Sequence, residues 1–437
     1  MTNLLRILYF LGSGLRRLSW HPIKLRSYQE KRLKAVIKYA YDYVPFYHEK
    51  FKEARISPSD IKHIDDLQKI PVVTKDDLRK EDPSRLVSIH YDYEKLIVQR
   101  TSGSTGTPFK SYIRSPEEDW RKAIYMRANI SCGQRPRDRW AFITDPRHYK
   151  DTTNIQYKFG IYAQRCIPIF SGVREQIQVI QDMKPDVIDG YSGAIFLMAK
   201  ELGKTGIDDV RPRMIFGSSD LMDAPSIKTI EGVFHAPYYD QVGCSEVDRT
   251  AWQCPEKIGY HMDVDSVITQ FVDPYGSDVS PGERGEITYT SLFNYAMPFI
   301  RYSTGDVGIP SREECTCGRN LPLMDVIEGR KDSFIVLHDG NIISPRALTV
   351  TMSTFPYYDD IDQFRIIQRK VDQFEIYLKM KRNNYDENDI KHKLEEYFFK
   401  LLNISKNETK VNINFVQNIP LSKTGRLMAV YSELNAL

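Results

Sequence analysis

The chain has 437 residues, of which 41% are hydrophobic and 27% are charged, and its formal net charge is +3. This composition is typical of a folded globular protein and excludes a fibrous or largely disordered chain. So small a net charge provides no basic surface for a phosphate backbone, and nucleic acid is therefore not an expected partner.

The N-terminal residues 4–17 predict a short basic helix. Its apolar positions are Leu4, Leu5, Ile7, Leu8, Phe10 and Leu11, with Arg6, Arg16 and Arg17 close by. The apolar stretch is too short to span a membrane and lacks the clean cleavage site of a signal peptide. We expect the helix to pack on its own domain; peripheral contact with the inner membrane surface is the alternative.

The next segments predict a helical region followed by two strands. Apolar residues recur at helical spacing from Tyr28 towards Lys52, and the helix is expected to stop before Pro45. Thr74 is expected to precede a second, capped helix. Strands are expected over residues 93–99 and 109–114, on either side of a loop rich in glycine and hydroxyl groups.

The pattern of apolar and polar residues then changes twice along the chain. Between residues 119 and 242 short apolar runs alternate with helical stretches, which predicts an α/β sheet. Residues 267–289 are rich in strand and turn signals, and a polar link at 329–332 precedes a last segment of strands and one long helix. We predict a large α/β domain over residues 1–330, with a β-rich subdomain, and a small α+β domain over residues 331–437.

The glycine-rich loop is a candidate phosphate site. It contains Thr101, Ser102, Gly103, Ser104, Thr105 and Gly106. Small residues allow backbone N–H groups to approach phosphates, and hydroxyl groups add further donors. The loop lacks the ending of a Walker P-loop, which disfavours kinase or GTPase chemistry of that type. Taken alone, a flexible Ser/Gly linker is an equally good interpretation.

Two carboxylates follow at informative places. Glu246 comes after a glycine turn and is suited to hold Mg²⁺ that bridges nucleotide phosphates. Asp306 comes directly after Thr304 and Gly305 and is suited to accept hydrogen bonds from both hydroxyls of a ribose. The segments 329–332 and 420–426 complete a series of five motifs.

These five motifs, in this order, resemble the adenylate-forming superfamily of acyl-CoA synthetases, adenylation domains and luciferases. Within it, the chain is most similar to the phenylacetate–CoA ligase and CapK-type capsule-biosynthesis branch, because residues 40–47 and 67–75 look like that branch's opening. The resemblance spans residues 33–429. It implies an ATP- and Mg²⁺-dependent ligase that converts a carboxylic acid to acyl-AMP and passes the acyl group to a nucleophile, with the CoA thiol favoured. A role in capsule or surface-polymer biosynthesis follows from the same branch.

The resemblance also implies roles for individual residues. Residues 101–106 would cover the β- and γ-phosphates of ATP. The adenine pocket would be lined by Ser218, Ser219 and Asp220, while Glu246 would bind Mg²⁺, Asp306 the ribose and Arg330 the nucleotide. Asp332 would be the hinge about which a mobile small domain rotates between the two half-reactions.

Two positions depart from the family pattern. Val242 stands where the family usually has an aromatic residue that stacks on adenine, and Tyr239 is the nearest substitute. Arg426 stands where the family has the lysine that stabilises charge during adenylation, with Lys423 three residues before it. A guanidinium fork does not reproduce the point charge of an ammonium group. A nucleotide-binding protein without turnover is therefore the alternative to an active ligase.

A separate set of residues suggests a metal site. Cys254, His261, Cys315 and Cys317 could form a closed tetrahedral zinc site of structural type. Six cysteines in so long a chain do not make a disulfide scaffold, which favours a reducing cytoplasm. Buried free thiols are the alternative interpretation, and a zinc-containing interaction protein is a third functional hypothesis. The identities of the acid and of the acyl acceptor, and the oligomeric state, stay open.

Overall fold

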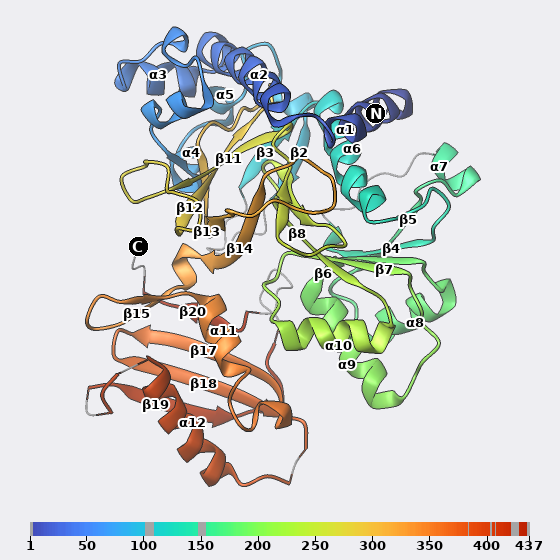
Figure 1. Ribbon diagram of the computed structural model, residues 1–437, viewed down its shortest axis with the longest axis vertical. Helices are drawn as coiled ribbons and strands as arrows, with labels where there is room; N and C mark the ends of the chain where they lie inside the picture. The colour runs from blue at the N-terminus through green and yellow to red at the C-terminus, as the bar shows by residue number, and fades with distance from the viewer. Residues whose placement is uncertain are drawn as a thin grey trace.

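The structure, a computed structural model, describes residues 3–100, 109–146, 154–382, 384–402, 404–406, 408–420 and 428–434. It has a large α/β part, drawn in blue to yellow in Figure 1, and a small α+β part, drawn in orange and red. The predicted α/β fold class is confirmed.

Helices at the N-terminus cover one end of the large domain (Figure 1). They are α1 (Leu4–Arg17), α2 (Pro22–Tyr43), α3 (Pro45–Glu53), α4 (Lys75–Arg79) and α5 (Pro83–Leu86). Val44 separates α2 from α3 in an extended conformation, because the residue before a proline disfavours helical geometry. Within the described residues, no helix has the length and apolar composition needed to cross a membrane.

Thr74 caps α4, as predicted. Its Oγ1 accepts a hydrogen bond from the backbone N–H of Asp77, at 3.2 Å, and Asp77 accepts one from the backbone N–H of Thr74, at 2.9 Å. This reciprocal capping box satisfies two backbone donors. It also fixes Lys75 as the first residue of α4.

A 12-stranded sheet forms the core of the large domain, in the order β11-β12-β13-β14-β10-β9-β8-β7-β6-β4-β5, with β1 (Val73–Thr74) added at β13. One half is parallel: β4 (Trp140–Thr144), β5 (Gln164–Pro168), β6 (Val187–Tyr191), β7 (Met214–Ser218) and β8 (Tyr238–Cys244). The helices of this region are α6 (Ser115–Ser131), α7 (Asn154–Phe159), α8 (Val173–Met183), α9 (Ser192–Thr205) and α10 (Ala224–Phe234). This is the alternation that the sequence predicts.

The other half of the sheet is antiparallel. It contains β9 (Asp248–Gln253), β10 (Tyr260–Met262), β11 (Val267–Val272), β12 (Gly285–Ser291), β13 (Tyr302–Pro310) and β14 (Leu323–Arg330). The β-rich segment predicted from the sequence is thus continuous with the α/β half through the pairing of β8 with β9.

A separate hairpin flanks the glycine-rich loop. β2 (Ile97–Arg100) pairs antiparallel with β3 (Lys110–Ile113), which confirms the predicted strands on either side of the loop. The first strand begins later than predicted because residues 93–95 form a 3₁₀ turn, whose start is capped by Asp92.

The small domain has a core of its own. Its sheet has the order β19-β18-β17-β20 and contains β17 (Ile361–Lys370), β18 (Gln373–Met380), β19 (Lys410–Phe415) and β20 (Val430–Ser432). A short hairpin, β15 (Ile335–Val336) and β16 (Ile342–Ile343), and the helices α11 (Pro345–Met352) and α12 (Glu387–Leu402) complete it. Leu394 and Phe398 of α12 are buried in this core.

Polar contacts join the two domains. Lys200 Nζ of α9 lies 2.6 Å from Asp362 Oδ1 of β17, and Lys379 Nζ lies 3.1 Å from Asp362 Oδ2. Tyr358 donates a hydrogen bond of 2.9 Å to Asp223, which caps α10. The small domain therefore docks against the C-terminal part of α9 and the start of α10.

Candidate active site and metal centre

The carboxyl ends of the parallel strands bring several candidate residues to one edge of the sheet. Tyr191, Ser218 and Cys244 are the last residues of β6, β7 and β8. Glu246 follows β8 two residues later. In α/β sheets, ligands bind in the crevice outside these strand ends. This edge is the candidate active site.

Glu246 is buried at this edge and held by two side chains. Lys75 Nζ lies 2.9 Å from its Oε1, and Tyr302 donates a hydrogen bond of 2.7 Å to the same oxygen. Burial opposes ionisation, but the charge of Lys75 and the hydrogen bonds from Tyr302 and Lys75 outweigh it, so the pKa of Glu246 lies below its ordinary value. Arg121 of α6 donates to the backbone carbonyl oxygens of Ser245 and Glu246 and fixes this turn.

Asp306 and Arg330 lie on the neighbouring strands β13 and β14. Asp306 of β13 is directly opposite Arg330 of β14 in the antiparallel register. Thr304 donates a hydrogen bond of 2.7 Å to Asp306 Oδ2. Because Tyr302 on the same strand contacts Glu246, β13 connects the three predicted residues Glu246, Asp306 and Arg330.

The turn after β7 carries the residues predicted to line the adenine pocket. Ser219 has a left-handed conformation, with φ of 75°. Asp220 is buried, and its Oδ2 accepts a hydrogen bond of 2.9 Å from the backbone N–H of Gly193, in the first turn of α9. Ser192 donates to the carbonyl oxygen of Ser218. Asp220 thus orders the turn, whereas its contact with adenine stays a prediction.

Tyr239 lies near position 242, where the family has an aromatic residue. Side chains alternate along a strand, so Tyr239 and Val242 lie on opposite faces of β8. Tyr239 is buried, with its ring 5.7 Å from the ring of Phe216. Its role as a substitute for adenine stacking stays a prediction.

Several predicted residues lie outside the described residues. These are Thr101, Ser102, Gly103, Ser104, Thr105 and Gly106 of the glycine-rich loop, and Lys423 and Arg426 near the C-terminus. Asp332 lies in a 3₁₀ turn at Lys331–Ser333, directly after β14, at the passage to the small domain. Its role as a hinge stays a prediction.

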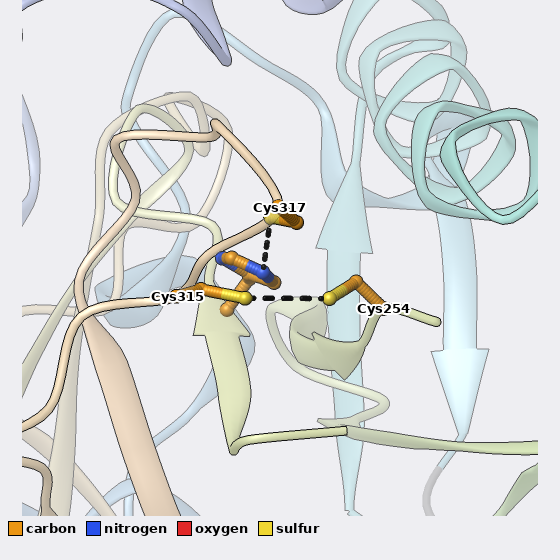
Figure 2. Close-up of side chains that lie close together, drawn as sticks. Cys254, Cys315 and Cys317 are labelled. Atoms are coloured by element: carbon orange, nitrogen blue, oxygen red, sulfur yellow. Dashed lines mark hydrogen bonds between the residues drawn. The ribbon is translucent and has the colours of Figure 1, made fainter. Parts of the chain in front are cut away.

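The four predicted zinc ligands come together. The ligand atoms of Cys254, His261, Cys315 and Cys317 all lie within 4.8 Å of one another. Figure 2 shows the three cysteine side chains converging on one point. Cys254 follows β9, His261 lies on β10, and the other two lie in the β13–β14 connection. The cluster therefore joins that connection to β9 and β10.

The geometry of the cluster fits a tetrahedral zinc ion. Cys254 Sγ and Cys315 Sγ are 3.5 Å apart, and Cys317 Sγ is 3.3 Å from His261 Nε2. Neighbouring ligands of a tetrahedral zinc ion with Zn–S bonds of about 2.3 Å are separated by about 3.5–3.8 Å. Burial, followed by the charge of Arg319, lowers the pKa of His261 to about 4, so its imidazole is neutral at pH 7.

Comparison with known proteins agrees with this arrangement. Residues 335–433 match the profile described as the CapK C-terminal domain. A phenylacetate–coenzyme A ligase from Thermus thermophilus is 27% identical over 386 residues, which is 86% of this chain and 83% of the relative. The chain is similar to ligases that activate a carboxylic acid. Its homologues are phenylacetate–CoA ligases.

Solved structures of acyl-CoA ligases share the fold. The crystal structure of 2-hydroxyisobutyryl-CoA ligase in the postadenylation state, with R3-HIB-AMP, has a TM-score of 0.77 at 20% identity, over 94% of this chain and 91% of that one. The same ligase in the thioesterification state, with 2-HIB-AMP and CoA, has a TM-score of 0.64 at 20% identity, over 96% and 92%. Both comparisons show that the chain shares the fold of this ligase.

Sequence reasoning missed two residues of the site. The sequence alone indicated no role for Lys75, at the end of the segment 67–75, or for Tyr302, four residues before Asp306. Each contacts Glu246 across a long sequence separation. The available signal was Thr74, whose predicted cap places Lys75 at a fixed position.

Proposed function

We propose that the chain activates a carboxylic acid with ATP and transfers the acyl group to coenzyme A. In the first step a carboxylate oxygen attacks the α-phosphorus of ATP, and pyrophosphate leaves. In the second step the CoA thiolate attacks the acyl carbon of the acyl-adenylate, and AMP leaves. Enzymes of this type act mainly by positioning their substrates and stabilising charge.

One observation carries this proposal. A buried glutamate, Glu246, is contacted by Lys75 and Tyr302 at the carboxyl ends of parallel strands, and Tyr302 lies on the strand that carries Asp306. Carboxylate oxygens suit Mg²⁺, and both contacts of Glu246 involve Oε1. We propose that the other oxygen takes part in binding Mg²⁺ that accompanies ATP.

The remaining residues have roles consistent with this reaction. Asp306 would accept the ribose hydroxyls, and Arg330 would neutralise charge on the nucleotide. The glycine-rich loop would cover the phosphates. Arg426, with Lys423 nearby, would supply the positive charge that the family draws from a lysine.

We further propose that Cys254, His261, Cys315 and Cys317 bind a structural zinc ion. Such an ion would hold the β13–β14 connection against β9 and β10, and thereby support the two strands that carry Asp306 and Arg330. The closed ligand set offers no open position, so zinc would be outside the chemistry.

The CapK-type small domain supports a role in the biosynthesis of a capsule or another surface polymer. Because ATP and CoA are the substrates of the proposed reaction, we place it in the cytoplasm.

The deciding experiment is acid-dependent exchange of labelled pyrophosphate into ATP. Wild type, Glu246→Gln and Arg426→Lys are compared across aryl, fatty and hydroxy acids, and CoA thioester formation is measured with any acid that supports exchange. We expect exchange in wild type, a loss of about 100-fold or more in Glu246→Gln, and retained or increased exchange in Arg426→Lys. Retained ATP binding with no exchange in wild type or Arg426→Lys would favour a nucleotide-binding protein without turnover.

A further inference from the structure

Helix α1 has two apolar faces, and the fold covers only one of them. Ile7 and Leu11 are buried in a small cluster with Ala123 of α6. On the outer side Leu5, Leu8 and Tyr9 are 78%, 50% and 68% exposed. Residues three and four positions apart lie on the same side of a helix, so these three form one continuous stripe.

Ion pairs fix α1 to the large domain. Arg6 lies 2.5 Å from the buried carboxylate of Asp119, and Arg17 lies 2.5 Å from that of Asp265. Asp265 also binds the buried Arg127, 2.7 Å away. The exposed stripe is therefore part of a rigid ridge, and its apolar side chains stay in water unless something outside the described residues covers them.

The charge around the ridge indicates the kind of partner. Residues 3–29 contain no aspartate or glutamate. Arg16 is exposed and lies seven residues after Tyr9, on the same side of α1, and the exposed Lys24 lies in the first turn of α2 beside Ile23, which is 75% exposed. Basic side chains next to exposed leucine and tyrosine match the interface of an anionic lipid bilayer. A second copy of the chain would bring like charges together.

We propose that the outer face of α1, with Ile23 and Lys24 of α2, docks on the surface of an anionic lipid bilayer. The apolar side chains enter the headgroup region, while Arg16 and Lys24 meet the lipid phosphates. In Figure 1, α1 lies at the end of the large domain away from the small domain. Binding through this face leaves the small domain free in solution, and the proposal does not depend on the proposed reaction.

The test is co-sedimentation of the full chain with vesicles of phosphatidylcholine alone or mixed with phosphatidylglycerol. Wild type is expected to bind the mixed vesicles and to bind neutral vesicles much less. Leu5→Ser/Leu8→Ser/Tyr9→Ser should weaken binding by about tenfold or more. Arg16→Gln/Lys24→Gln should weaken binding to mixed vesicles by about fivefold for each charge removed.

A matched control removes the same kind of side chain elsewhere. Ile89, Val350 and Tyr275 are also exposed, and Ile89→Ser/Val350→Ser/Tyr275→Ser should bind vesicles like wild type. Circular dichroism checks that each variant folds, and sedimentation velocity reports its oligomeric state. The proposal would be overturned if wild type does not bind vesicles, or if the α1 variant binds them as well as wild type does. It would also be overturned if wild type is a dimer that the α1 substitutions dissociate, because the face would then belong to a second copy.

Discussion

At the scale of single residues, the site depends on how a buried carboxylate is neutralised. Glu246 has lost its hydration, and an isolated carboxylate in that position would take up a proton rather than stay charged. Lys75 and Tyr302 compensate for this loss through contacts of 2.9 and 2.7 Å. These two contacts therefore hold the carboxylate charge that the proposed Mg²⁺ site requires.

Removing Lys75 should destabilise the protein in a pH-dependent way. The depressed pKa of Glu246 stabilises the fold above the ordinary carboxyl pKa, and this stabilisation is lost as pH falls through the lower folded value. In Lys75→Met burial dominates instead, so we expect a loss of about 2 kcal/mol at pH 7 and a smaller loss near pH 4. Urea denaturation at both pH values measures the difference.

Lys69→Met is the matched control, since Lys69 pairs with Asp66 at an exposed site. This substitution should lower the free energy of unfolding by less than about 1 kcal/mol. Equal losses for Lys75→Met at the two pH values would contradict the role of Lys75 as the counter-ion of Glu246.

Asp240 gives a second pH-dependent prediction, of opposite sign. Burial raises its pKa to about 6, although Tyr260 and Tyr238 donate hydrogen bonds to it. Because the folded chain binds this proton more tightly than the unfolded chain, the carboxyl group destabilises the fold progressively as pH rises from about 4 to about 6. Relative to wild type, Asp240→Asn should gain up to about 3 kcal/mol over this range in urea denaturation. A pH-independent difference would contradict the raised pKa.

At the scale of secondary structure, the connection between β13 and β14 depends on the cysteine cluster. Residues 311–322 contain Cys315 and Cys317, and the strands on either side carry Asp306 and Arg330. Arg319 donates a hydrogen bond of 2.7 Å to the carbonyl oxygen of Ser131, and the backbone N–H of Asn320 donates one to that of Leu18, so the end of the connection is anchored. The proposed zinc ion would add a cross-link at Cys315 and Cys317.

We expect one zinc ion per chain in protein purified without chelator, measured by elemental analysis. Cys315→Ser should lose the ion and lower the melting temperature by several degrees, because a closed metal site stabilises the folded state. Cys166→Ser changes a cysteine of β5 outside the cluster, and it should keep the zinc ion and the wild-type melting temperature. Metal-free wild type with the stability of the metal-loaded protein would refute the structural role.

At the scale of the whole molecule, the two domains meet through a few polar contacts. Asp362 of the small domain forms ion pairs with Lys200 of the large domain and with Lys379 of its own sheet. Interfaces of this polar kind allow domains to change their relative position.

Asp362→Asn should shift the domains away from the described arrangement, because it leaves Lys200 without its carboxylate partner in a mostly buried position. We expect the ratio of docked to undocked molecules to fall by about tenfold, measured by fluorescence energy transfer between labels on the two domains. Glu201→Gln, on the same helix but paired with the exposed Arg174, is the control and should leave transfer unchanged. Unchanged transfer in both variants would show that these contacts do not set the arrangement.

The sequence by itself determined the features that depend on local spacing. The order of the motifs, the alternation of strands and helices, the cap at Thr74 and the strands around the glycine-rich loop all follow from periodicity and backbone hydrogen bonding within a few residues. The four cysteine and histidine positions were also recognisable, because few residue types form a closed zinc site.

Only the tertiary structure decided which distant residues meet. Lys75 reaches Glu246 because α4 follows β1, which pairs with β13, whose Tyr302 contacts the same carboxylate. The packing of Tyr239 against Phe216 was not predictable either, because neighbouring strands, not distance along the chain, set which face of a strand meets the core. These contacts could not be predicted because the order of strands in the sheet decides which distant residues meet, and the sequence does not reveal that order.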